Sequence, residues 1–185
     1  MSINPYAPPT AVVADVLLSN PERRTISPFF AVSLSKLTVM SLCTFGFYQL
    51  FWFYQHWRHI RNREGSRLLP ALRAIFCLLF CYACFARIRD HPSDEPPSSG
   101  RLSALTLTVA WTVTSLLSRL PAPFLLVGFA AVVFLLPVQA RANRINAEVA
   151  PAHDPNTSFG VLNWITIVVG GSLFVLGVIG LLLKP

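Results

Sequence analysis

Three cysteines share one face of a predicted helix in the apolar stretch 74–86. Cys77, Cys81 and Cys84 stand at positions i, i+4 and i+7, a spacing that brings side chains onto the same helical face. With Cys43 from the preceding apolar block, their thiolates could bind Cu(I) or zinc. Cysteine also packs as a small apolar residue, and the stretch has no CxxC pair and no histidine. Packing is therefore favoured, and no cofactor and no metal ligand is predicted.

His56 and His59 lie one helical turn apart, so both could contact one metal ion. The only carboxylate close by in the sequence is Glu64. A helix that lies against lipid headgroups explains the two histidines without a metal, and this interpretation is preferred.

Two His–Asp neighbours fall in proline-containing loops, Asp90-His91 and His153-Asp154. Catalysis by such a pair also requires a nucleophile and an oxyanion donor, and the sequence offers neither. Aspartate is a common turn residue, which accounts for Asp154. No catalytic residue is predicted, and an enzyme is not favoured.

A cluster of arginines follows the first aromatic-rich block. Lysine and arginine near a membrane surface attract anionic headgroups, with about 1 kcal/mol for each residue. The cluster is predicted to bind lipid headgroups, and the alternative is that it only sets membrane orientation. Its members are Arg58, Arg61, Arg63, Arg67 and Arg73.

The composition indicates a membrane protein. Hydrophobic residues make up 54% of the 185 residues and charged residues only 12%, where a soluble domain has about 25%. The apolar residues occur in long blocks, which in lipid must be helical because backbone polar groups need internal partners. We therefore predict an all-α, polytopic integral membrane helix bundle. The net charge of +7 comes mostly from residues beside the apolar blocks, so anionic lipid is the expected partner and nucleic acid is not.

The chain divides into a polar, proline-containing tail over 1–28 and a helical membrane domain over 29–185. No signal peptide is recognised in the tail. The first block is predicted to span over 29–52 and then continue as an interfacial helix, since its aromatic residues favour the water–lipid boundary. The fourth is predicted to continue as a polar helix as far as Pro151. The five membrane-embedded segments are expected at about 29–57, 68–86, 102–118, 124–138 and 161–183.

The number of crossings depends on segment 68–86, whose uninterrupted apolar stretch is short for a span of about 20 residues. If it crosses, basic residues divide almost evenly between the two sides. If it does not cross, ten basic residues gather on one side against five on the other, which places the ten in the cytoplasm. Four and five crossings both remain open.

Small residues in the last segment, 161–183, could form a contact between helices. Gly170, Gly177 and Gly180 recur at intervals of seven and three, and glycine lets helices approach closely in a membrane. The pattern predicts helix packing there, with a homo-oligomer or an unknown membrane partner as the expected association.

The stretch from Met40 to Gly65 resembles the opening of a family of small, uncharacterised bacterial inner-membrane proteins with a domain of unknown function. The shared pattern is a Thr-x-Gly-x-Tyr break, an aromatic cluster and then a basic helix; one departure is Phe51, where such proteins often carry tyrosine. The matching residues are Thr44, Gly46, Tyr48, Trp52 and Tyr54. The stretch from Leu136 to Trp164 is similar to the tail of longer members. The resemblance implies a multi-pass location in the bacterial inner (cytoplasmic) membrane, and it implies no activity or catalytic residue.

Three functions are compatible with the sequence. The leading one is a structural or accessory inner-membrane protein with a basic, headgroup-facing helix. The second is a small channel or transporter, for which a polar cavity lined by Thr106, Thr108, Thr112, Thr114 and Ser115 is expected. The third is a membrane-bound metal-handling or redox protein, for which Cys43, Cys77 and Cys81 must come together.

Overall fold

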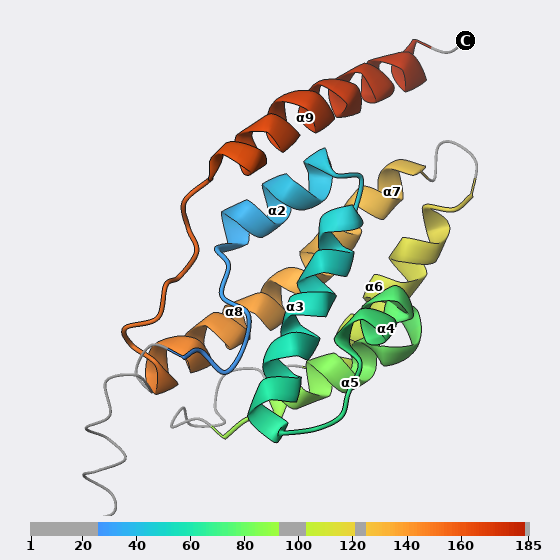
Figure 1. Cartoon of the computed structure of the whole chain (residues 1–185). Helices are drawn as coiled ribbons and strands as arrows, with labels where there is room; N and C mark the ends of the chain where they lie inside the picture. The colour runs from blue at the N-terminus through green and yellow to red at the C-terminus, as the bar shows by residue number, and fades with distance from the viewer. Residues whose placement is uncertain (1–25, 93–102, 121–124, 184–185) are drawn as a thin grey trace, which may run out of the picture.

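The computed structural model of the protein describes residues 26–92, 103–120 and 125–183, and every regular element in these ranges is an α-helix (Figure 1). The predicted all-helical fold is thereby confirmed. The predicted tail lies outside the described residues apart from 26–28. In chain order the helices are α2 (Leu34–Cys43), α3 (Phe47–Glu64), α4 (Pro70–Ile75), α5 (Cys77–Arg89), α6 (Ala104–Leu117), α7 (Leu125–Phe129), α8 (Ala131–Val149) and α9 (Val161–Leu182).

The first apolar block, 29–57, folds back on itself and does not form one crossing helix. Helix α2 ends in a turn where Phe45 and Gly46 both have positive φ, 53° and 88°, a conformation that no continuous α-helix contains. The chain then reverses into α3. As a result, the Nδ1 atom of His59 lies 3.0 Å from the carbonyl oxygen of Ser27. The predicted single span within this block is therefore wrong.

The cysteine-bearing segment 68–86 forms a helical hairpin beside α3. Helix α4 begins with Pro70, whose fixed φ suits a helix start, and it breaks at Phe76 before α5 runs back. The Nε atom of Arg87 lies 3.0 Å from the Oε1 atom of Glu64, so α3 and α5 finish at the same end of the bundle. This segment therefore does not carry the chain from one end of the bundle to the other.

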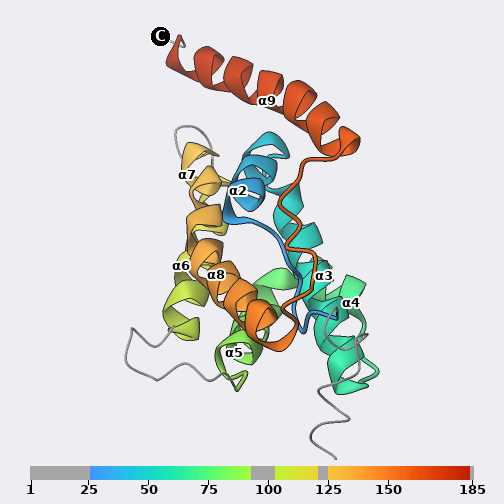
Figure 2. The same cartoon turned by 90° about the vertical axis from the view of Figure 1, so that its left-hand side faces the viewer.

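Helix α3 packs one face against the bundle, and this face supplies much of the aromatic core (Figures 1 and 2). Trp52, Phe53 and Trp57 are fully buried, and Phe53 stacks on Phe85 of α5 with ring centroids 6.0 Å apart. These rings were expected at the water–lipid boundary, and for the three buried residues that expectation is wrong. Large rings fill the space between short helices and bury more apolar area than aliphatic side chains do.

Helix α8 carries the fourth apolar block onward into a polar stretch. It continues past Pro137 to Val149, which confirms the predicted polar extension of this block. A short helix, α7, precedes it and is separated from it at Ala130. Two amides in the polar part of α8, Gln139 and Asn146, are fully buried, so these side chains point toward the core.

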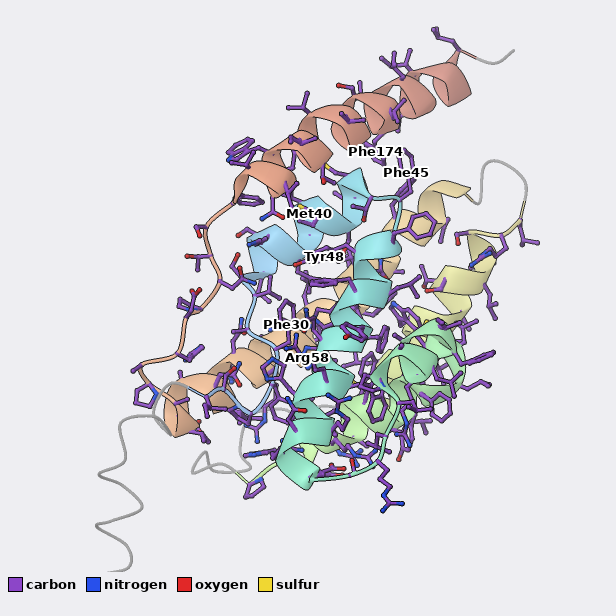
Figure 3. All side chains as sticks on the ribbon, viewed as in Figure 1. Phe30, Met40, Phe45, Tyr48, Arg58 and Phe174 are labelled. Atoms are coloured by element: carbon purple, nitrogen blue, oxygen red, sulfur yellow. The ribbon has the colours of Figure 1, made fainter. Side chains whose placement is uncertain are left out.

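Helix α9 lies across one edge of the bundle and packs against α2 (Figure 2). Its residues Val161–Gly180 form the one helix, in the part of the chain that the structure describes, that is long and apolar enough to cross a membrane. The apolar helix α6 has 14 residues, which corresponds to about 21 Å against a hydrocarbon core of about 30 Å. Near the middle of α9, the Phe174 ring faces Phe45, with centroids 6.4 Å apart (Figure 3). It also meets the ring of Phe129, with centroids 4.7 Å apart.

Candidate lipid-contacting site

Three of the five predicted headgroup arginines have little contact with the rest of the protein. Arg58 and Arg67 are exposed, and neither has an ion pair or a ring contact with another described residue. The guanidinium of Arg61 bonds only the neighbouring amide of Asn62, at 3.3 and 3.4 Å. These three cations remain available for an external anion.

The other two predicted headgroup arginines are held by aromatic rings. The guanidinium carbon of Arg63 lies 4.7 Å from the centroid of Phe29, and that of Arg73 lies 4.4 Å from Trp57 and 5.0 Å from Phe80. A cation over a ring face is attracted by the ring quadrupole. Arg63 and Arg73 therefore fasten α3 and α4 to the fold, and sequence spacing alone did not separate them from the other three.

Further charged residues gather where α3, α5 and α8 finish, at the same end of the molecule (Figure 1). The His91 ring packs edge-on against Phe29, 5.4 Å between centroids. Burial lowers the pKa of His91, the nearby cations Arg63 and Arg141 lower it further, and Glu148 raises it. Side chains from α3, from α8 and from the turn after α5 therefore share one electrostatic environment. We call this region the basic end, and its cations are Arg58, Arg61, Arg63, Arg67, Arg87, Arg89, Arg141 and Arg144.

Large apolar side chains are exposed at the other end of the bundle. They belong to the α2–α3 turn, the start of α3, the α4–α5 junction, the end of α6 and the start of α7 and α8. We call this region the apolar end. Its exposed residues include Phe45, Phe47, Leu50, Phe51, Ile75, Phe76, Leu78, Leu116, Val127 and Val133. The exposed surface is thus divided unevenly along the bundle axis. Large apolar residues predominate at one end and arginines at the other, although Arg119 is exposed at the apolar end and Leu105 and Val149 are exposed where α6 begins and α8 ends.

Amide side chains of α8 bind the extended segment that precedes α2. Asn146 makes two hydrogen bonds to the backbone of Phe29, both 3.0 Å long. Gln139 and Asn143 each donate one bond to a carbonyl oxygen further along the same segment, at 3.0 and 2.9 Å. Buried backbone groups need partners, and this amide clamp supplies them where no helix does.

Gln139 is also the centre of a buried hydrogen-bond network. Its Oε1 atom accepts from the indole Nε1 of Trp52 at 2.6 Å and lies 3.1 Å from the Nε2 atom of His56. Its amide nitrogen donates to the side chain of Asn143 at 2.7 Å, which fixes the orientation of the amide. His56 therefore carries its proton on Nε2, and its Nδ1 atom has no partner among the described residues.

Sequence reasoning missed the amide clamp and this network. The visible signal was the spacing of Gln139, Asn143 and Asn146, which is i, i+4 and i+7 and places three amides on one helical face. The stretch was interpreted as a polar helix outside the membrane. A row of uncharged amides on one face of a helix indicates that these side chains form hydrogen bonds with buried, non-helical backbone of another segment.

The cysteines do not form a metal site in the described part of the chain. Cys77, Cys81 and Cys84 are buried in the bundle, and the Sγ atom of Cys81 lies 3.9 Å from the Thr112 hydroxyl. Cys43 lies instead at the end of α2, beside α9. No three His, Cys, Asp or Glu side chains among the described residues come close enough together to hold a metal ion.

A cavity of about 700 Å³ lies at the apolar end. Of the hydroxyl residues expected to line a polar cavity, Ser115 is part of its wall, and the four threonines are not among the described residues that line it. The wall is mainly apolar and includes Trp111, whose Nε1 donates to the Oε1 of Gln49 at 2.8 Å.

The three glycines of α9 have different surroundings. A Cβ atom at Gly170 would collide with the carbonyl oxygen of Cys43, so α9 approaches α2 at a point where only glycine fits. Gly177 and Gly180 have open space around them in the single chain. Helix packing at Gly177 and Gly180 therefore stays a prediction, and it concerns contact with a second protein molecule.

Lys36 connects α2 to the segment before α9. It is 5% exposed, and its ammonium donates to the Oδ1 of Asn156 and to the carbonyl oxygen of Ser158, both at 2.7 Å. These bonds satisfy a buried cation. They also hold the chain that leads into α9 against α2.

Comparison with protein-family models, with curated proteins and with solved structures gave no match. The fold thus defines an all-helical protein which, over the residues that the structure describes, has one candidate membrane-crossing helix.

Proposed function

We propose that the protein is a polytopic, structural or accessory protein of the bacterial inner membrane, whose basic end binds anionic lipid headgroups. The observation that carries this proposal is the division of the exposed surface along the bundle axis. An apolar end is stable in hydrocarbon, and a cationic end is stable at the headgroups of an anionic leaflet.

The chemistry of the basic end fits phosphate oxygens. The guanidinium groups of Arg58, Arg61 and Arg67 are not used by the fold, and a guanidinium matches phosphate geometry with two parallel hydrogen bonds. Cations at the ends of α3 and α5 also oppose the negative ends of these helix dipoles. These cations therefore stabilise the helices that present them.

The amide clamp supports burial of the bundle in a bilayer. Non-helical backbone at membrane depth is tolerated only where protein satisfies its polar groups. Asn146, Gln139 and Asn143 do this for the extended segment before α2. A channel is less favoured because large rings, among them Trp52 and Trp57, fill the centre of the bundle.

Replacing Arg58, Arg61 and Arg67 together with glutamine is expected to weaken binding of phosphatidylglycerol relative to phosphatidylcholine by roughly a hundredfold, from about 1 kcal/mol for each cation. The measurement is lipid binding by the detergent-solubilised full chain in native mass spectrometry. The triple Arg→Lys variant keeps the charge and should keep most of the preference. Equal lipid preference in the Gln variant and the wild type would refute headgroup binding by these residues.

Membrane orientation gives an independent test of the proposed embedding. Single cysteines at Asn62 and Asp90, near the ends of α3 and α5, should react with an impermeant maleimide from the same side of sealed vesicles, because Glu64 and Arg87 bring these ends together. A cysteine at Leu120, after α6 at the apolar end, should not react from that side. The wild type, with its native cysteines, serves as background. Labelling of positions 62 and 90 from opposite sides contradicts the proposed arrangement.

A further inference from the structure

The cavity at the apolar end combines an apolar wall with a few polar groups. Its volume of about 700 Å³ falls in the usual range of about 300–1,000 Å³ for ligand pockets. Phe47 and Leu78 form part of the wall and are 73% and 42% exposed, so the cavity is bordered by side chains at the outer surface. Trp111 closes its inner side and is 3% exposed.

The polar groups of the cavity include hydrogen-bond donors. Ser41 borders the cavity, but it is 2% exposed, and its hydroxyl, which has no partner among the described residues, has almost no accessible surface. The Oε1 atom of Gln49 is occupied by Trp111, which leaves the amide nitrogen of Gln49 as the donor. Arg119, at the end of α6, is an exposed cation in the wall. No aspartate or glutamate is among the described residues that line the cavity.

We propose that this cavity is a binding site for one acyl chain with an anionic oxygen headgroup. The chain lies among the aromatic and aliphatic side chains of the wall, where it loses contact with water or with bulk lipid. The headgroup oxygens accept hydrogen bonds from the donors of the cavity, and Arg119 provides the opposite charge. The same chemistry belongs to a fatty acid and to a phospholipid. This site is separate from the basic end and does not depend on headgroup binding there.

The test is equilibrium binding of radiolabelled palmitate to the delipidated, detergent-solubilised full chain. We expect saturable binding with one site. Leu78→Trp fills the cavity and should weaken binding at least tenfold, whereas Leu79→Trp should leave it unchanged, because Leu79 is 76% exposed and is not part of the wall. Arg119→Gln should weaken palmitate binding about fivefold, as expected for one lost charge near a headgroup, and leave binding of neutral hexadecanol unchanged.

The results separate the possible outcomes. Unlabelled phosphatidylglycerol and unlabelled palmitate are compared as competitors of the radiolabelled palmitate. If phosphatidylglycerol displaces it more effectively, the ligand is a phospholipid. If phosphatidylglycerol displaces it less effectively, the ligand is a fatty acid. Non-saturable binding, or equal binding by the Leu78→Trp and Leu79→Trp variants, overturns the proposal. Arg119 is exposed, so its variant keeps the test decisive if Leu78→Trp does not fold. The triple Arg variant of the basic end should bind palmitate normally, which keeps this test distinct from that of the proposed function.

Discussion

Replacement of Gln139 with leucine is expected to lower the free energy of unfolding by at least about 3 kcal/mol, because each buried polar group left without a partner costs about 1–3 kcal/mol. Four groups lose their hydrogen bond to Gln139. The indole N–H of Trp52 and the Nε2–H of His56 are buried, and the carbonyl oxygen of Phe30 and the Oδ1 of Asn143 are partly buried. Leucine is similar in size, so the change acts mainly on hydrogen bonds. Denaturant titration in detergent micelles, followed by tryptophan fluorescence, measures the loss.

The matched control for this prediction is Gln55→Leu. Gln55 lies beside His56 on α3, is only partly buried, and has no hydrogen bond from its side chain to another described residue. Its replacement should change the free energy of unfolding by less than about 0.5 kcal/mol, as surface substitutions usually do. Equal losses in the two variants would show that Gln139 does not organise the core.

Replacement of Gly170 with alanine is expected to separate α9 from α2. A Cβ atom at this position would collide with a backbone atom, the carbonyl oxygen of Cys43, which cannot rotate away as a side chain does. The readout is a disulfide between Cys43 and a cysteine introduced at Gly171, where an ideal Cβ lies 3.6 Å from the Sγ of Cys43. A disulfide is geometrically within reach from there after a small rotation. Oxidation should link the two positions almost completely in the Gly171→Cys protein and lose most of this yield when Gly170→Ala is added.

Gly177→Ala provides the control for this experiment, since nothing lies within 4 Å of a Cβ at that position. The Gly171→Cys, Gly177→Ala protein should form the disulfide as well as Gly171→Cys alone. Peptide mapping distinguishes this link from any that involves the buried Cys77, Cys81 and Cys84. An undiminished yield with Gly170→Ala would show that α9 does not approach α2 at this glycine.

These two sites show how the protein holds two segments against the bundle, the extended chain before α2 and helix α9. The extended chain before α2 is satisfied by amides of α8, and α9 is held by Gly170, by Lys36 and by the ring of Phe174. Each contact joins parts of the chain that are distant in sequence. The buried network around Gln139 also accounts for His56, which sequence reasoning had placed at a lipid surface.

Local patterns predicted the elements well. Long apolar blocks predicted helices close to the observed α6 and α9, and the polar stretch after the fourth block was correctly continued as α8. The all-helical class and the exposed arginines of the basic end also follow from composition and spacing.

Only the tertiary structure decided which of these elements meet. The first block reverses at Phe45 and Gly46 because α3 finds its partners inside the bundle, and no periodicity within the block specifies that reversal. Arg63 and Arg73 look like the other arginines in the sequence, yet rings supplied by Phe29 and Trp57 hold them in the fold. Spacing along the chain determines which side chains share a helical face. Which group lies opposite that face depends on packing between distant segments. This packing separates an exposed arginine, such as Arg58, from one that aromatic rings hold in the fold, such as Arg73.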